Sequence, residues 1–188
     1  TLMKKTFLIF ILSFSISSCQ SGQIDNTQTT FTDSQAQADD FDYSSGYDRI
    51  EQIKEWYKEA SDYKNNPKKV NKSETEDGLL SGKKLTLRNG FEILITKANG
   101  DESTETTEYY FKDEKVFFAY RSGRSEGYSY QYRYYFSDDG EVIKILEKND
   151  NGTGAMSGNR EMQGSEFRNL SEEIKNDVMD AEALFYGC

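Results

Sequence analysis

Tyrosine is the residue type whose spacing in this sequence most strongly suggests chemistry, because eight of the 13 tyrosines lie between Tyr109 and Tyr135. Side chains alternate between the two faces of a β-strand. In a strand over residues 128–136, one face carries Tyr128, Tyr130, Tyr132, Tyr134 and Phe136, and the other carries Ser129, Gln131, Arg133 and Tyr135. Such a row forms either half of a core with its hydroxyls at the rim, or an exposed platform that stacks sugar rings or peptide. We favour the core, because soluble monomers rarely expose so large an apolar patch.

The candidate ligand-binding residues are all on this strand: Tyr128, Tyr130, Tyr132, Tyr134, Arg133 and Tyr135. If Lys84, Thr86 and Arg88 mark the solvent face of the first strand, helices cover the Tyr132 side of the sheet. The opposite face is then the candidate binding surface.

Carboxylates are a second source of chemistry, since a glycosidase needs only two of them. The sequence has 33 acidic residues, so pairs arise by chance and no motif singles one out. Asp138-Asp139 has the character of a turn. A carboxylate-based hydrolase therefore remains only an alternative.

Other catalytic and metal-binding signals are weak. The sequence contains no histidine, which removes the commonest general base and nitrogen metal ligand. Gly-x-Ser-x-Gly does not occur, and Cys188 has no neighbouring base. If a calcium loop began at Glu147, its twelfth residue would be Gly158 instead of the required glutamate. We therefore expect that the protein is not an enzyme, binds no metal and has no cofactor other than a covalent lipid. Cys188 is interpreted as a free or buried thiol or as an intermolecular disulfide.

Six strands are predicted to hold these residues, over 85–87, 91–95, 104–112, 115–121, 128–136 and 141–147. Their short connections favour antiparallel pairing. Asn89-Gly90 predicts a type I′ hairpin turn, which needs two positive φ values. Residues 68–82 are expected to form an irregular connection.

Two helices flank the strands. The first is predicted over residues 48–62, where Asp48 and Glu51 have capping-box spacing and apolar residues recur every three or four positions. The second is predicted to begin near Ser171, an N-cap residue followed by two glutamates. The expected fold is therefore α+β, an antiparallel sheet of five or six strands with both helices packed on one face.

The N-terminal segment predicts where the protein is located, not what activity it has. Lys4 and Lys5 precede an apolar run of about a dozen residues, the pattern of a secretory signal peptide and too short to span a bilayer. The sequence Ile16-Ser17-Ser18-Cys19 resembles the lipobox of bacterial lipoproteins. That resemblance implies that Cys19 becomes the first residue of the mature chain and carries at least a diacylglyceryl group, with acyl chains such as palmitate. An ordinary signal peptide or a membrane helix is the alternative.

The sequence thus divides into a signal peptide (1–18), a flexible tether (19–45) and one globular α+β domain (46–188). Removing the signal peptide leaves 33 acidic and 21 basic residues, a net charge of −12. So acidic a chain is a poor partner for nucleic acid. Expected partners are the lipid bilayer and an envelope protein or glycan. Gln20 after Cys19 hints at the outer membrane, periplasmic side. The leading interpretation is a non-enzymatic binding or structural module; the alternative is a carbohydrate or peptide binder that uses an exposed tyrosine-rich face.

Overall fold

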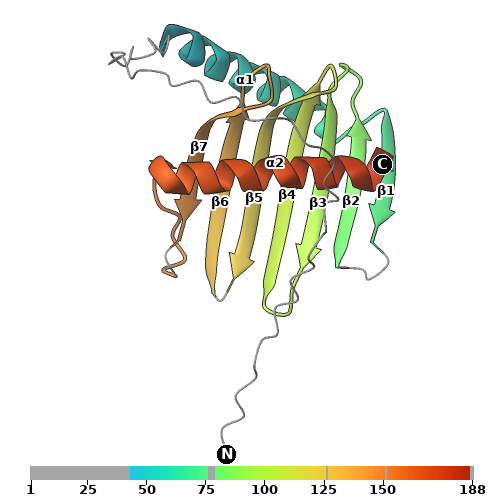
Figure 1. Cartoon of the computed structure of the whole chain (residues 1–188). Coiled ribbons are helices and arrows are strands. Elements are labelled where there is room, and N and C mark those ends of the chain that lie inside the picture. The colour runs from blue at the N-terminus through green and yellow to red at the C-terminus, as the bar shows by residue number, and fades with distance from the viewer. Residues whose placement is uncertain (1–42, 76–78, 126, 151, 187–188) are drawn as a thin grey trace, which may run out of the picture. The chain divides into compact units, whose positions relative to one another are not determined.

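The computed structural model describes residues 43–75, 79–125, 127–150 and 152–186 of the chain, which form two helices and one sheet, so the fold is α+β (Figure 1). The elements in chain order are α1 (Tyr43–Lys64), β1 (Lys69–Glu74), β2 (Leu80–Thr86), β3 (Glu92–Asn99), β4 (Ser103–Lys112), β5 (Lys115–Ser125), β6 (Tyr128–Phe136), β7 (Val142–Asn149), β8 (Arg160–Glu161) and α2 (Gly164–Tyr186).

The sheet is a meander in which eight strands lie side by side in chain order, every neighbouring pair antiparallel. The prediction of five or six strands is wrong because it misses the two edge strands. β1 has no buried residue and so shows no apolar alternation, and β8 is only two residues long. Backbone pairing to one neighbour holds each of them, and a sequence pattern does not report such pairing.

The type I′ geometry expected at Asn89-Gly90 occurs instead at Asp113-Glu114. Asp113 (φ 50°) and Glu114 (φ 64°) are the two residues between β4 and β5, and both have positive φ. At the β2–β3 turn only Gly90 does, with φ 89°. That loop is longer, so one glycine is enough to close it.

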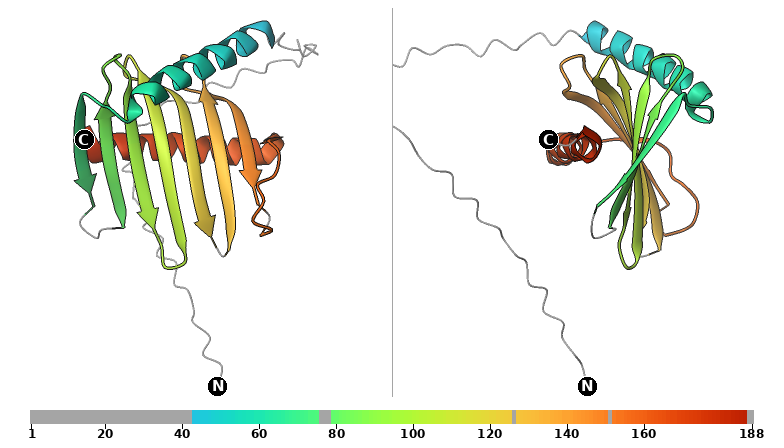
Figure 2. Two further views of the ribbon diagram at one scale, coloured as in Figure 1. Left: turned by 180° about the vertical axis from the view of Figure 1, so that it is seen from behind. Right: turned by 90° about the vertical axis from the view of Figure 1, so that its right-hand side faces the viewer.

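The two helices pack on opposite faces of the sheet, so the prediction that they share one face is wrong (Figure 2). The buried residues of the α2 side are Leu94, Tyr109, Phe111, Ala119, Tyr134, Phe136, Val142, Ile145, Met162, Ile174, Val178 and Ala181. Those of the α1 side are Ile53, Ala60, Leu85, Leu87, Phe91, Ile93, Tyr110, Phe117, Phe118 and Tyr135. Neighbouring apolar residues in one strand, such as Tyr109-Tyr110 and Tyr134-Tyr135, point to opposite faces and require two covers.

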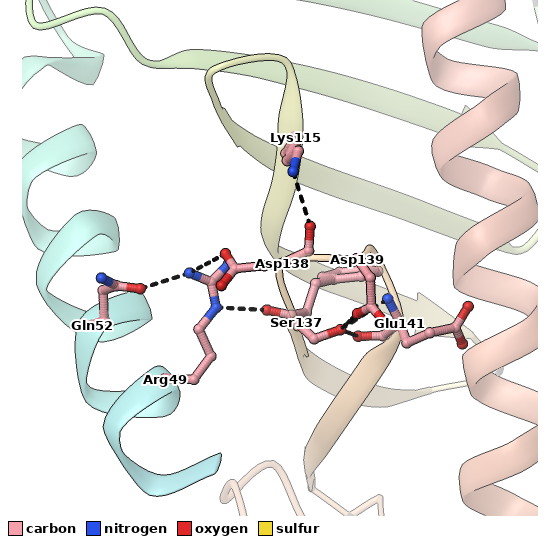
Figure 3. A network of polar contacts seen from close by, with 8 residues as sticks. Arg49, Gln52, Lys115, Ser137, Asp138, Asp139 and Glu141 are labelled. Atoms are coloured by element: carbon pink, nitrogen blue, oxygen red, sulfur yellow. Dashed lines mark hydrogen bonds and ion pairs between the residues drawn. The ribbon is translucent and has the colours of Figure 1, made fainter. Parts of the chain in front are cut away.

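Helix α1 covers only the end of its sheet face where the turns lie (Figure 2). Arg49 fixes it there: its Nε donates to the Phe136 carbonyl at 3.2 Å, and its guanidinium pairs with Asp138 at 2.9 Å (Figure 3). Trp56 packs edge-on against Phe117, with ring centroids 5.4 Å apart. Among the residues that the structure describes, no helix covers the rest of that face.

Both helices begin earlier than predicted. Helix α1 starts at Tyr43, because an apolar stripe marks only the packed part of a helix. Helix α2 starts at Gly164, and Ser171 is not its N-cap but a buried residue inside it. The Ser171 hydroxyl donates to the carbonyl of Phe167, the residue one turn earlier, and this bond accommodates a serine within a helix.

Candidate functional site

The tyrosine row of β6 lies on the sheet face that α2 covers, as the core interpretation predicts. Burial increases along the strand: Tyr128 is 43% exposed, Tyr130 and Tyr132 are half-buried, and Tyr134 is 0% exposed. Tyr135, on the opposite face, is buried under α1. An exposed tyrosine platform is therefore a wrong prediction for Tyr134 and Tyr135.

The half-buried tyrosines also lack the geometry of a stacking platform. Neighbouring rings are tilted by 41°, 52° and 37°, so they do not form one plane. The Tyr130 hydroxyl donates to Glu105 at 2.7 Å, and the Tyr132 hydroxyl donates to Glu147 at 3.0 Å. Burial, together with the bond to Glu147, raises the pKa of Tyr132 to about 12. These hydroxyls thus hold the sheet together instead of facing a ligand.

Arg121 of β5 lies between the tyrosine row and α2, and sequence reasoning missed it. It is 4% exposed and surrounded by carboxylates: Glu105 at 3.4 Å, Glu173 at 2.5 Å and Asp177. Burial disfavours the charged guanidinium, but its neighbours, Tyr134, Glu105 and Asp177 first, outweigh that effect and raise the pKa of Arg121. The cluster links α2 to the sheet, and the Arg121 guanidinium is already paired with these carboxylates.

The carboxylates beside α2 were the remaining candidates for hydrolysis. Glu105, Asp177 and Asp180 line a cavity of about 140 Å³ with Thr96 and Thr107. That volume is well below the roughly 300–1,000 Å³ of typical ligand pockets. Burial raises the pKa of Asp177, yet Asp177 and Glu105 both pair with Arg121. The cavity is thus too small for a sugar, and of its three carboxylates only Asp180 forms no ion pair with a described residue, so it lacks two free carboxylates for a glycosidase pair.

The part of the α1-side face that α1 does not cover is the better candidate, and we name it the open face. It comprises Lys72, Lys83, Ile95, Lys97, Thr106, Tyr120, Ser122, Arg124, Gln131, Arg133, Leu146 and Lys148, which the strand register places on one side of the sheet. Most of its charged residues are basic, and they lie on β1, β2, β3, β5, β6 and β7. No other surface of the described residues gathers unpaired cations over so many strands.

None of its six basic residues forms an ion pair with any residue that the structure describes: Lys72, Lys83, Lys97, Arg124, Arg133 and Lys148. Arg133 donates only to the neutral side chain of Asn159, at 3.0 Å. Three acids of the strands face this side. Glu108 pairs with Lys64 at 2.6 Å, Glu161 pairs with Lys144 at 2.8 Å, and Glu74 lines the same hollow as Lys72, Lys83 and Lys97. The open face is thus basic on a chain of net charge −10.

A polar row crosses the middle of the open face. Lys97, Thr106, Ser122, Gln131 and Lys148 are opposite one another on five successive strands, β3 to β7. Four strand spacings of about 4.8 Å place its two lysines roughly 19 Å apart. Beside it, Lys72, Lys83 and Lys97 line a shallow hollow of about 550 Å³. The surface therefore has one shallow hollow, carries charges at intervals and is rich in hydrogen-bonding side chains.

The structure places the predicted site residues in different environments. Arg133 lies on the open face with Gln131, whereas Tyr135 is buried. The condition attached to that binding surface, that Lys84, Thr86 and Arg88 mark a solvent face opposite Tyr132, is wrong. Lys84 and Thr86 lie on the Tyr132 side, where Lys84 contacts the ring of Tyr186 in α2. Cys19, Cys188 and the proposed signal peptide and tether up to residue 42 lie outside the described residues. Within the described part, no group of three or more acidic residues is placed to hold a metal ion, and no helix has the length and apolar character to cross a membrane.

Comparison with known proteins finds no matching family model, no matching curated protein and no matching solved structure. The functional argument therefore depends on the geometry of the chain itself. The cations on β1, β2, β3, β5 and β7 were missed because each is unremarkable in sequence. Only the alternation of charged and apolar residues within a strand, as in Lys83 to Leu85, hints that they share a face.

Proposed function

We propose that this protein is a lipid-anchored lipoprotein of the bacterial cell envelope whose folded domain is a non-enzymatic binding module, with the open face as its contact surface. The lipobox resemblance at Cys19 supports the anchor, and Gln20 supports the outer membrane, periplasmic side. The bilayer and an envelope protein or glycan are then its partners. The acidic chain weighs against nucleic acid.

One observation carries the binding proposal: cations without partners are gathered on an exposed sheet face. Folded proteins normally intersperse the two signs of charge, and cations gathered on one face without an ion pair experience mutual repulsion. A ligand of negative charge offsets it. The buried tyrosines and the committed Arg121 cluster support a structural role for the other face.

The test is photo-crosslinking in the cells that make the protein. A photoreactive phenylalanine at Ser122, in the centre of the open face, is expected to form a crosslink in intact cells. The matched control places it at Arg168, an exposed residue of α2 on the opposite side, where no crosslink is expected. Equal or no crosslinking at both positions refutes the binding surface.

The anchor is tested separately. Mass spectrometry of the mature amino terminus is expected to find Cys19 with a covalent lipid, and Cys19→Ser is expected to move the protein from the membrane to the soluble fraction. Because each buried CH₂ contributes about 0.8 kcal/mol, loss of the acyl chains removes the whole membrane affinity. An unmodified Cys19, or cleavage at another bond, refutes the anchor.

A further inference from the structure

We infer that the ligand of the open face is a linear acidic polysaccharide lying across the strands. The inference rests on the proposed function and adds the chemical class of its ligand. Three properties of the open face carry it: the number and spread of its cations, the polar row between them, and the small number of exposed apolar side chains beside them.

The cations extend across the sheet, so a polymer that carries negative charges at regular intervals can contact all of them. Lys72 and Lys83 are directly opposite each other on β1 and β2, Lys97 follows on β3, and Arg124 and Lys148 continue the series on β5 and β7. From β1 to β7 this is six strand spacings, roughly 29 Å. A single small anion would touch one or two of these groups. A chain with one carboxylate or sulfate on each sugar or every second sugar meets all of them.

The polar row supplies what a sugar chain needs besides charge. Thr106, Ser122 and Gln131 stand between Lys97 and Lys148 with hydroxyl and amide groups half-exposed. The structure gives none of the three a side-chain partner among the described residues. Hydroxyl and amide groups donate and accept, so they match the donor–acceptor character of sugar hydroxyls. The row runs at right angles to the strands, which sets the direction of the ligand.

A protein partner or a bilayer surface fits this face less well. Protein interfaces have apolar cores enriched in aromatic residues and methionine, and peripheral membrane surfaces insert such residues. On the open face Ile95, Tyr120 and Leu146 are only partly exposed, and Val70 of edge strand β1, 47% exposed, is the one strand residue on this side among the exposed large hydrophobic residues. The backbone groups of β2 to β7 pair within the sheet, so an added peptide strand finds no free bonding groups there.

The experiment is a titration of the mature, lipidated protein in non-ionic detergent with a decamer of galacturonic acid. We expect saturable binding that weakens as salt is raised above about 0.15 M, because the exposed charges are then increasingly screened. The methyl-esterified decamer keeps the sugar and removes the charge, and poly-L-glutamate of equal charge keeps the charge and removes the sugar. Both are expected to bind at least about tenfold more weakly, a difference of about 1.4 kcal/mol.

Matched variants locate the site. The triple variant Lys83→Glu, Lys97→Glu and Arg124→Glu is expected to lose at least about tenfold in affinity for the decamer. The control Lys69→Glu, Arg88→Glu and Arg168→Glu changes the net charge equally at exposed residues outside the open face and is expected to bind as the wild type does. Equal losses in both variants, or poly-L-glutamate binding as tightly as the decamer, overturn the inference.

Failure of this inference is distinguishable from failure of the proposed function. If the decamer does not bind but Ser122 still crosslinks in cells, the polysaccharide is wrong and the open face remains a contact surface with another ligand. If neither is observed, both proposals fail.

Discussion

Replacing Arg121 by methionine should destabilise the fold by about 2–3 kcal/mol. Methionine fills a similar volume but leaves the carboxylates of Glu105, Glu173 and Asp177 facing one another without a cation. Removing one partner of a fully buried ion pair costs about 3–5 kcal/mol. Here the acidic side chains are 33%, 54% and 36% exposed, so water offsets part of the loss and we expect less than the full value.

The assay is urea unfolding followed by the fluorescence of Trp56, the only tryptophan of the chain. Trp56 lies on α1, on the other side of the sheet from Arg121, so its signal reports unfolding of the domain as a whole. The midpoint and slope of the transition give the free energy of unfolding. The matched control is Arg124→Met on the same strand, exposed and without an ion pair, for which we expect less than about 0.5 kcal/mol.

Two outcomes contradict this reasoning. If Arg121→Met and Arg124→Met differ by less than about 1 kcal/mol, the buried cluster does not hold α2 to the sheet. If Asp177→Asn costs as much as Arg121→Met, the argument from unpaired carboxylates is also wrong. Asp177→Asn should cost less, because Arg121 keeps Glu105 and Glu173.

Three further predictions concern single side chains. Glu114→Gly should stabilise the domain by about 0.5–1 kcal/mol, because glycine has no steric cost at φ 64°; an unchanged or lower melting temperature contradicts it. Tyr134→Phe should be neutral or stabilising, because the buried hydroxyl has no hydrogen-bond partner in the described structure; a loss of more than about 1 kcal/mol in urea unfolding would show a hidden bond. Bonds from Arg160 and Tyr132 outweigh burial and lower the pKa of Glu147 from its usual 4.5, so its stabilisation is present at neutral pH and lost on acidification. The stability difference between wild type and Glu147→Gln should therefore shrink as the pH falls below 4.5 through the lowered pKa of the folded state, and a constant difference refutes the assignment.

The central strands were predictable because their side chains carry the packing signal themselves. β3 to β7 alternate or pair apolar residues, and the stripe Ile174, Val178 and Ala181 marks the packed part of α2. The edge strand β1 and the first turns of both helices are held by backbone bonds or extend past the core. Sequence periodicity reports burial, so it does not report these parts.

The placement of the helices was predictable in part. Tyr109-Tyr110 and Tyr134-Tyr135 put aromatic residues on both faces of neighbouring strands, and that pattern already requires a cover on each side. The open face was not predictable, because it depends on the register of six strand pairings. A slip of one residue in β3 would move Lys97 to the α2 side.

The separation of charge across the sheet leads to a final prediction about salt. The acidic residues Glu105, Glu173 and Asp177 lie on the α2 side, and the open face lies on the other. At 0.15 M salt the Debye length is about 8 Å, so an anionic ligand at the open face is attracted by the nearby lysines and hardly repelled by the far acids. At 0.01 M it is about 30 Å, and the whole net charge of the mature chain, −12 from 33 acidic and 21 basic residues, repels the ligand. Affinity for the galacturonate decamer should therefore be highest at intermediate salt and fall on either side. A steady decrease from the lowest salt concentration upward would show that the distant acids are irrelevant and that local attraction alone governs binding.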